Sequence, residues 1–411
     1  MVPSLSLIVP VLLLVACTNC NASCSDSLLL SSSAGIERYG LDTSGHWYAI
    51  TRPFDGYQQL VVDGKETGVW DTIQPPIFSF DGSTWATTAK RSGQWFIVTN
   101  QGVHTSTVPI LQIHFPRQSS TLWWVEQIGA TFRITNGNTE YVTTYPVEDL
   151  CTDPQGIVAA WKETRLGTQI IYKNGAEVAR GPTLSLYNIW TDGRCLYSTS
   201  QGQLIDVLLG TMELVVGMRT VFVVKTNPFG TLAAWQAADA VGQVHTYIYT
   251  DEYLHPWEGP VVSAPDKQLA LSPFDPLVAY RTVRQGSKVV GYNSAFYPAG
   301  VTASPPVFSN DGSVMVYGSK DNSNFVVVNG KRHLVNAGVP TTDVMVVNPR
   351  GNYVAWCSPT TLVVVGLDFN KLTLGRMCDT MGTVMYNRHM DSFMALGTVS
   401  GHLYLLSCDA F

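Results

Sequence analysis

Acidic side chains outside turns are the first place to look for chemistry in this sequence. Acidic residues are sparse, and turn-like sequences hold several of them, as at Asp63, Asp81 and Asp311; four carboxylates are less turn-like, namely Glu126, Glu148, Asp149 and Glu163. A glycoside hydrolase needs two such groups held about 5–9 Å apart. Spacing along the chain does not pair any two of these four. The sequence therefore predicts turn, surface and structural roles for the acidic residues and assigns no catalytic one.

Histidines, serines and glycines do not form a recognisable reaction centre either. The eight histidines are scattered, with no two closer than ten positions, whereas a metal site needs clustered ligands. The sequence contains no Gly-x-Ser-x-Gly nucleophile motif and no glycine-rich phosphate loop. We therefore predict no metal site and no cofactor.

A tight polar turn recurs along the chain and sets a regular period. The first six turns follow at steps of 37 residues, and the next four at steps of 46, 36, 39 and 40; their turn residues are Gly45, Gly82, Ser119, Gly156, Gly193, Gly230, Pro276, Gly312, Gly351 and Asp391. A small or apolar residue and an aromatic come shortly after most turns. A β-rich run ending in Asp-Gly or Asn-Gly follows in several units, as at Asp63-Gly64 and Asn174-Gly175. Such dipeptides favour hairpins because both residues accept positive φ.

Each unit therefore resolves into four short antiparallel strands. Tandem units of this kind predict an all-β fold, a β-propeller of about ten short four-stranded repeat units. The aromatic of each second strand is expected to pack between neighbouring blades. The long step around residues 251–265 is either an ordinary loop or a division between two five-bladed rings. We favour one ring.

The two ends of the chain favour a closed ring. The last unit supplies only three strands, at about 383–387, 393–399 and 402–407. Residues 27–33 can supply the missing fourth strand, which removes the open edge. Antiparallel pairing of these ends would place Cys24 beside Cys408, so we predict a Cys24–Cys408 disulfide. Residues 23–411 then form a single propeller domain.

The repeat resembles that of the TolB-like, WD-related propellers of exported bacterial proteins. That family repeats Phe-Ser-Pro-Asp-Gly before an Ala-aromatic strand. Residues 78–82 and 308–312 match this pattern except at the proline, whereas residues 227–230 and 348–351 keep Pro and Gly but lose Asp. The resemblance covers nearly the whole chain after residue 22. It implies a rigid disc whose loops bind ligands, and it does not define a function.

A carbohydrate-active propeller enzyme, sialidase-like or another glycoside hydrolase, is the alternative function. Residues 79–85 resemble the sialidase Asp box but lack one residue between Asp and Gly. Residues 132–135 resemble the Phe-Arg-Ile-Pro segment without its proline. A sialidase-like site also needs several arginines on inner strands, and the candidates do not occupy a repeated position: Arg52, Arg117, Arg133 and Arg281.

Two segments interrupt the repeat and are the best candidates for binding. One is the insertion at residues 251–258, from which we select Tyr253, His255 and Trp257 as ligand-binding residues. The other is residues 292–297, where aromatics replace the expected Asn-Gly turn. Loops on a rigid scaffold carry function disproportionately, and Tyr and Trp are common interface anchors. The sequence favours a non-enzymatic binding or scaffold module with a protein partner, and a glycan is the second class of ligand.

Composition limits the partners of this chain. Charged residues make up 14% and hydrophobic residues 45% of the 411 residues, with a formal charge of −6. The apolar content excludes disorder as the main state. The weak acidity argues against nucleic acid as a partner, because such sites are basic. No interior segment reaches the roughly 20 apolar residues of a membrane helix.

Residues 1–22 have the features of a signal peptide. Leu5–Ala16 is mostly apolar and too short to cross a bilayer. Cleavage after Ala22 would leave a secreted chain with six of the eight cysteines, an even number suited to an oxidising compartment. Residues 14–17 instead resemble a bacterial lipobox in which Cys17 is lipidated. Both routes predict export to the extracellular space or the cell envelope, with membrane contact only through this candidate anchor.

Overall fold

A computed structural model of the chain describes residues 23–31, 35–253, 255–266, 268–340, 345–369 and 372–409. Every regular element in these ranges is a β-strand. Within the same ranges, no helix could cross a membrane. The predicted signal peptide at 1–22, with the candidate lipobox at 14–17 and Cys17, lies outside the described residues.

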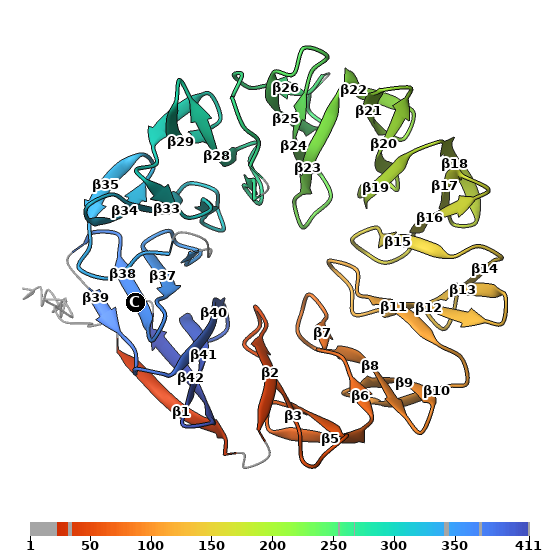
Figure 1. Ribbon diagram of the computed structural model, residues 1–411, viewed down its shortest axis with the longest axis horizontal. Coiled ribbons are helices and arrows are strands. Elements are labelled where there is room, and N and C mark those ends of the chain that lie inside the picture. The colour runs from red at the N-terminus through yellow and green to blue at the C-terminus, as the bar shows by residue number, and fades with distance from the viewer. Residues whose placement is uncertain are drawn as a thin grey trace, which may run out of the picture.

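Ten antiparallel sheets form the blades of one ring, as predicted, and nine of them are built from consecutive strands (Figure 1). Blades 1 and 2 contain β2 (Ile36–Leu41), β3 (Trp47–Thr51), β4 (Gln58–Val62) and β5 (Lys65–Trp70), then β6 (Thr72–Ile73), β7 (Ile77–Phe78), β8 (Trp85–Arg91), β9 (Gln94–Thr99) and β10 (Gly102–Ser106). Blade 3 contains β11 (Ile110–His114), β12 (Trp123–Ile128), β13 (Thr131–Thr135) and β14 (Glu140–Thr143). Blades 4 and 5 contain β15 (Val147–Thr152), β16 (Ala159–Arg165), β17 (Thr168–Lys173) and β18 (Ala176–Gly181), then β19 (Leu184–Ile189), β20 (Cys195–Gln201), β21 (Leu204–Leu209) and β22 (Met212–Met218).

The second half of the ring continues in the same order. Blades 6 and 7 contain β23 (Thr220–Thr226), β24 (Leu232–Ala238), β25 (Val244–Thr250) and β26 (Trp257–Glu258), then β27 (Ala270–Leu271), β28 (Val278–Arg284), β29 (Ser287–Tyr292) and β30 (Ala295–Pro298). Blades 8 and 9 contain β31 (Thr302–Ala303), β32 (Val307–Phe308), β33 (Met315–Lys320), β34 (Asn324–Val328) and β35 (Lys331–Leu334), then β36 (Val346–Val347), β37 (Tyr353–Cys357), β38 (Leu362–Gly366) and β39 (Leu372–Leu374). Blade 10 contains β40 (Thr380–Asn387), β41 (Ser392–Val399), β42 (His402–Asp409) and, from the other end of the chain, β1 (Cys24–Leu30).

Prolines divide the inner strand of two blades. In blade 2, Pro75 and Pro76 separate β6 from β7, and in blade 8 Pro305 and Pro306 separate β31 from β32. A proline has no N–H to donate to the ladder, so pairing with the second strand stops at these positions and resumes after them. Both pieces pair with the same second strand, so each blade keeps its four-strand width.

The ring closes by pairing the two ends of the chain, as predicted. Strand β1 runs antiparallel to β42, with Cys24 opposite Cys408 and Leu30 opposite Leu403. Figure 1 shows β1 along the outer edge of blade 10. The Cys24–Cys408 disulfide is present. The remaining four described cysteines are thiols, namely Cys151, Cys195, Cys357 and Cys378.

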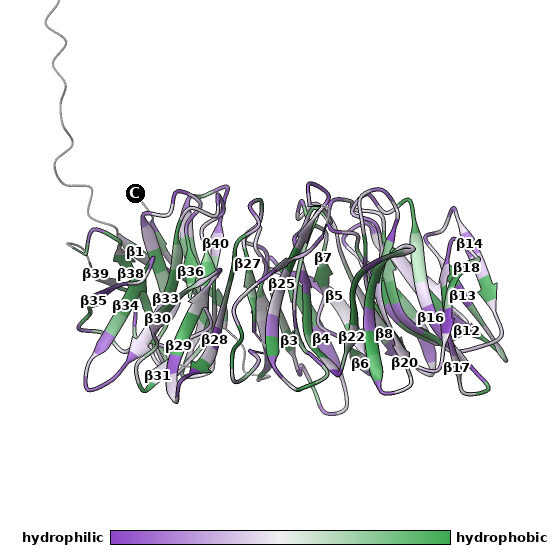
Figure 2. Cartoon of the chain, turned by 90° about the horizontal axis from the view of Figure 1, so that it is seen from above, coloured by the Kyte–Doolittle hydropathy of each residue, from purple (hydrophilic) through white to green (hydrophobic). Residues whose placement is uncertain are grey.

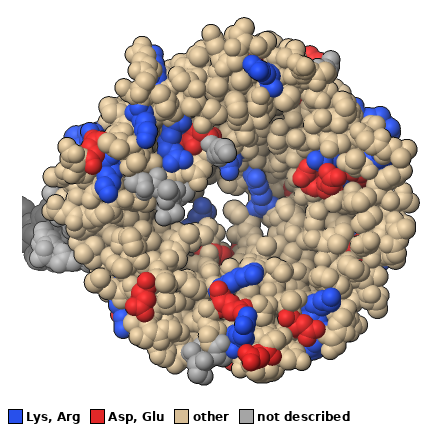
Figure 3. Space-filling view, in the orientation of Figure 1, with Lys and Arg blue, Asp and Glu red and all other residues tan. Residues whose placement is uncertain are grey.

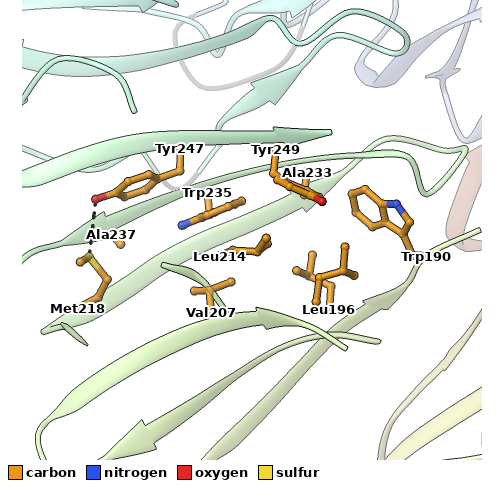
Figure 4. Packing of buried hydrophobic residues seen from close by; sticks show 11 residues of the cluster. Trp190, Leu196, Val207, Leu214, Met218, Ala233, Trp235, Ala237, Tyr247 and Tyr249 are labelled. Carbon is orange, nitrogen blue, oxygen red and sulfur yellow. Dashed lines mark hydrogen bonds between the residues drawn. The ribbon is translucent and has the colours of Figure 1, made fainter. Parts of the chain in front are cut away.

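Aromatic and aliphatic side chains fill the spaces between blades. Between blades 5 and 6, Trp235 stacks on Tyr247 with ring centroids 5.5 Å apart, and the Tyr247 hydroxyl reaches the Met218 sulfur at 3.8 Å (Figure 4). The predicted second-strand aromatics are almost fully buried, among them Trp161, Trp235, Tyr280, Tyr317 and Trp356. Seen from the side, the blades form a flat disc (Figure 2).

Candidate ligand-binding site

The predicted binding loop joins β25 to β26 at the rim of blade 6. Asp251 anchors its start to blade 5, because it accepts hydrogen bonds from the Trp190 indole at 2.7 Å and from Arg194 at 2.6 Å. His255 is exposed and Tyr253 is half-buried. Trp257 belongs to β26, pairs with Ile248 and packs against the core between blades 6 and 7. Among the described residues, no hydrogen bond or ring contact joins the three selected side chains.

The segment 292–297 differs from its prediction. A two-residue turn, Asn293–Ser294, is retained between β29 and β30, and Asn293 adopts a positive φ of 48°. Asparagine accepts this conformation more readily than most residues, so glycine is not required. The aromatics that follow lie on β30, and the ring of Tyr297 covers Gly330 of blade 8. Their role is to pack one blade on the next.

The four carboxylates outside turns lie in blades 3 and 4, where each has cationic partners. Glu126 is 1% exposed; it accepts a hydrogen bond from the Trp124 indole at 3.0 Å and pairs with Arg133. Glu163 repeats this arrangement with Trp161 and Arg165. Nearby, the ammonium group of Lys162 contacts two further carboxylates, Glu148 at 3.2 Å and Asp149 at 2.8 Å. A buried carboxylate with an indole donor and a guanidinium is a structural element.

The four arginines considered for a sialidase-like site are also separated. Arg52 pairs with Glu37 in blade 1, Arg133 with Glu126 in blade 3, and Arg281 with Asp266 in blade 7. Arg117 binds the turn of blade 6. Each guanidinium thus binds its own separate partners, and the four do not converge on one substrate position.

Polar contacts between inner strands join blades 3 to 6. The Arg117 guanidinium donates to the Thr226 hydroxyl at 2.9 Å and to the Asn227 carbonyl at 2.7 Å. His114 contacts the Thr152 hydroxyl at 3.0 Å, and burial, reinforced by Arg117, lowers the pKa of His114 to about 4. Figure 3 shows an open passage at the centre of the ring with lysine and arginine side chains at its rim. The hydrogen bonds of Arg117 and His114 therefore tie inner strands together.

A cleft of about 520 Å³ opens between blades 1 and 2. Its walls carry one indole, Trp85, and an exposed aliphatic side chain, Val103. Its polar groups come from both blades and include His46, Asp63, Glu66 and Asn100. A volume of this size and a mixture of apolar wall and convergent polar groups are typical of small-ligand sites.

The polar side of the cleft is held in place by hydrogen bonds. His46 Nδ1 lies 2.7 Å from Asp63 Oδ2, and the other Asp63 oxygen accepts the backbone N–H of Trp47 at 3.0 Å. One Glu66 oxygen accepts from the Gln59 amide at 2.9 Å. Among the described residues, no hydrogen bond joins the His46 side chain to a hydroxyl or a thiol.

Trp85 departs from the repeat. It stands opposite the last residue of the inner strand, and in the nine other blades the residue in this position is buried; these residues are Trp47, Trp123, Ala159, Cys195, Ala233, Val278, Met315, Val354 and Ser392. Trp85 alone among the ten is partly exposed. Trp85 packs in part against the core between blades 1 and 2, and it also lines the cleft.

Glu66 lines the cleft at a position that an aromatic ring holds in blade 3. It follows the closing pair of its hairpin, as Tyr141 does in blade 3. Tyr141 packs between Trp123 and Trp161 and touches Gly175 in the hairpin turn of blade 4. Exposed glutamates also hold this position in blades 4 and 5, at Glu177 and Glu213.

The cleft was not predicted from the sequence, although the sequence contains a signal for it. Residues 79–85, including Trp85, were compared only with the sialidase Asp box. In blade 1, Lys65 and Glu66 follow the hairpin turn. In blade 3, the corresponding residues are Glu140 and Tyr141, so an aromatic stands second after the turn. Alignment of the hairpins, in addition to the first turns, would have placed Glu66 at the position of Tyr141, which Glu177 and Glu213 hold in blades 4 and 5.

Comparisons with known proteins assign neither a family nor a function to this chain. The sequence matches no protein-family model and no curated protein. Solved structures of similar shape include a eukaryotic initiation factor, at 9% identity and a TM-score of 0.49 over 76% of this chain and 90% of that chain. The Dos1 propeller is 10% identical, with a TM-score of 0.38 over 80% of this chain and 90% of that chain. A chain from a mitotic checkpoint complex is 10% identical, with a TM-score of 0.36 over 72% of this chain and 99% of that chain. These values transfer no function.

Proposed function

We propose that this protein is a non-enzymatic binding module, an exported propeller that takes a ligand in the cleft between blades 1 and 2. The observation that carries this proposal is the cleft itself, where an indole and several polar side chains converge on about 520 Å³ at one interface of a repeated structure. The loop with Tyr253, His255 and Trp257 is proposed as a second contact, for a protein partner.

The arrangement of charged groups favours binding over hydrolysis. Glu126 and Glu163 are occupied by indole and guanidinium donors, and Glu148 and Asp149 share Lys162. A hydrolase needs a carboxyl group that can exchange a proton with substrate. Glu126 and Glu163 are buried and paired, and the more exposed Glu148 and Asp149 are paired with one ammonium group, so this arrangement favours structural roles.

Export remains part of the proposal. The Cys24–Cys408 disulfide supports it, because such bonds persist in oxidising compartments. A TolB-like relationship and the candidate lipid anchor at Cys17 are likewise proposed.

An affinity experiment on the oxidised full-length protein tests this function. Immobilised wild-type protein is incubated with the extracellular and envelope fractions of the source cells, and the retained molecules are identified by mass spectrometry before and after incubation. We expect a defined molecule to be retained chemically unchanged. Retention should fall at least tenfold in Trp85→Ala for a cleft ligand, or in the triple alanine variant of Tyr253, His255 and Trp257 for a protein partner.

Two results would contradict the proposal. Release of cleaved products by the wild-type protein would identify an enzyme. Equal retention by wild type and by both variants would place binding elsewhere on the molecule. Because Trp257 packs against the core, the triple variant is compared at a temperature where circular dichroism shows it to be folded.

A further inference from the structure

The cleft between blades 1 and 2 has the chemistry of a site for an uncharged sugar ring. We propose that its ligand is a neutral pyranose residue, free or at the end of a glycan. This inference rests on the proposed binding function and specifies its ligand. It uses the composition of the walls, their charge and the way the cleft is opened.

The apolar wall suits one face of a sugar. Trp85 is partly exposed beside Val103, which is 52% exposed, while Val98 is buried beneath them. A pyranose presents C–H groups on one face and hydroxyls around its edge. An indole offers a broad, rigid apolar surface with a polar N–H at its edge, so the two shapes and polarities match.

The polar wall provides both donors and acceptors, as hydroxyl groups require. The Glu66 carboxylate has acceptor sites beyond its bond to Gln59. The Asn100 amide donates to the Ser83 carbonyl at 2.8 Å, which leaves its oxygen as an acceptor. Gln101 adds a second amide and Lys65 an ammonium donor. A hydroxyl donates one hydrogen bond and accepts others, so this mixture satisfies it.

The charge of the cleft disfavours anionic ligands. Lys65 and Glu66 carry opposite charges, and Asp63 is bonded to His46. Phosphate and carboxylate ligands are normally held by arginines or by clustered backbone N–H groups. No arginine is among the residues that line this cleft. A neutral ligand avoids the cost of an unpaired buried charge.

In blade 3, the space that corresponds to this cleft holds an aromatic ring. At the equivalent interface between blades 3 and 4 the ring of Tyr141 lies 5.3 Å from that of Trp161 and touches Gly175. Between blades 1 and 2 the corresponding room is lined by Glu66 and the turn Asn100–Gln101. A six-membered sugar ring is similar in width to the phenol ring that fills the space elsewhere.

Direct binding measurements test the ligand class. The oxidised full-length protein is applied to an array of neutral and acidic glycans, and hits are titrated by calorimetry with neutral mono- and disaccharides. We expect binding to neutral glycans, weakened at least tenfold by Trp85→Ala. The matched control is Trp95→Ala on strand β9, whose ring lies near Lys90 and does not line the cleft; it should bind within twofold of wild type.

A second variant tests the geometry without removing a core residue. Glu66→Tyr should fill the cleft as Tyr141 fills its own interface, so binding is lost while the unfolding temperature is maintained. Equal losses in Trp85→Ala and Trp95→Ala would overturn the site. Binding of acidic glycans only would overturn the ligand class.

The outcomes separate this inference from the proposed function. If no glycan binds but a peptide or protein is retained by wild type and lost in Trp85→Ala, the cleft is a binding site for a protein and the sugar is wrong. If a neutral glycan binds and is then cleaved, the ligand class stands and the non-enzymatic function fails.

Discussion

Removal of the Cys24–Cys408 disulfide should destabilise the closure of the ring more than any single substitution in a blade. The two cysteines are 384 positions apart. In the chain-entropy description, closing a loop of this length in the unfolded chain stabilises the folded protein by about 6 kcal/mol. The Cys24→Ser/Cys408→Ser variant should therefore unfold at a distinctly lower guanidinium concentration.

The packing of β1 explains why little else compensates for this loss. Its residues from Ser25 to Ser27 are exposed, and Leu28 is 54% exposed. The ion pair between Arg376 and Asp26 is also at the surface, where such pairs contribute little. Strand β1 is thus held by its ladder with β42, by the disulfide and, at its second half, by the packing of Leu29 and Leu30 on the core. Its departure would expose the edge of β42.

Guanidinium unfolding followed by tryptophan fluorescence measures the effect. Oxidised wild type, reduced wild type and the double serine variant are compared, and mass spectrometry confirms the state of the bond. We expect reduction to lower the midpoint of wild type to that of the variant, and to leave the variant unchanged. Equal midpoints for the oxidised and reduced wild type would refute the reasoning and assign closure to the strand ladder alone.

Two other predictions concern groups inside the ring. Burial beside Arg117 lowers the pKa of His114 to about 4 from 6.5, so the neutral histidine stabilises the fold above pH 6.5, and this stabilisation is lost as the pH falls to 4. Because His114 is partly exposed, the loss stays below about 3 kcal/mol. His114→Gln should flatten the acid side of the curve of stability against pH, and an unchanged slope would contradict this prediction. Burial raises the pKa of Cys151 to about 12 and of Cys195 to about 11, so iodoacetamide at pH 8 should leave both thiols unmodified in the native protein, and rapid labelling of either would argue against their burial.

The ring and its closure could be predicted because their signals are local and repeated. At Asn174–Gly175 both residues adopt positive φ, 49° and 83°, as an Asn-Gly hairpin turn requires. The closing strand was expected at 27–33 and is described at Cys24–Leu30, because a strand that pairs along an exposed edge has no buried alternation to mark its limits. The cysteines located the pairing despite this error.

The role of the loop residues was harder to predict, since it depends on contacts made far along the chain. Trp257 belongs to a strand of two residues, too short to show the alternation that marks a strand. Its burial comes from the neighbouring blade. Asp251 is fixed by Trp190 and Arg194, which lie on blade 5 and have no sequence relation to the loop. Spacing along the chain does not carry this information.

The cleft could be recognised from the sequence only by comparing equivalent positions of the repeats, and this comparison requires the strand pairing of each hairpin. The turn before Glu66 has two residues, Asp63–Gly64, whereas the turn before Tyr141 has four, so a fixed period does not align the two positions. Once the strands are paired, the absence of a ring at Glu66 and the exposure of Trp85 occur at the same interface. The exposure of Trp85 departs from the packing of the nine other blades, and it leaves apolar area in contact with water, which costs free energy. A ligand that covers the indole would recover that area on binding.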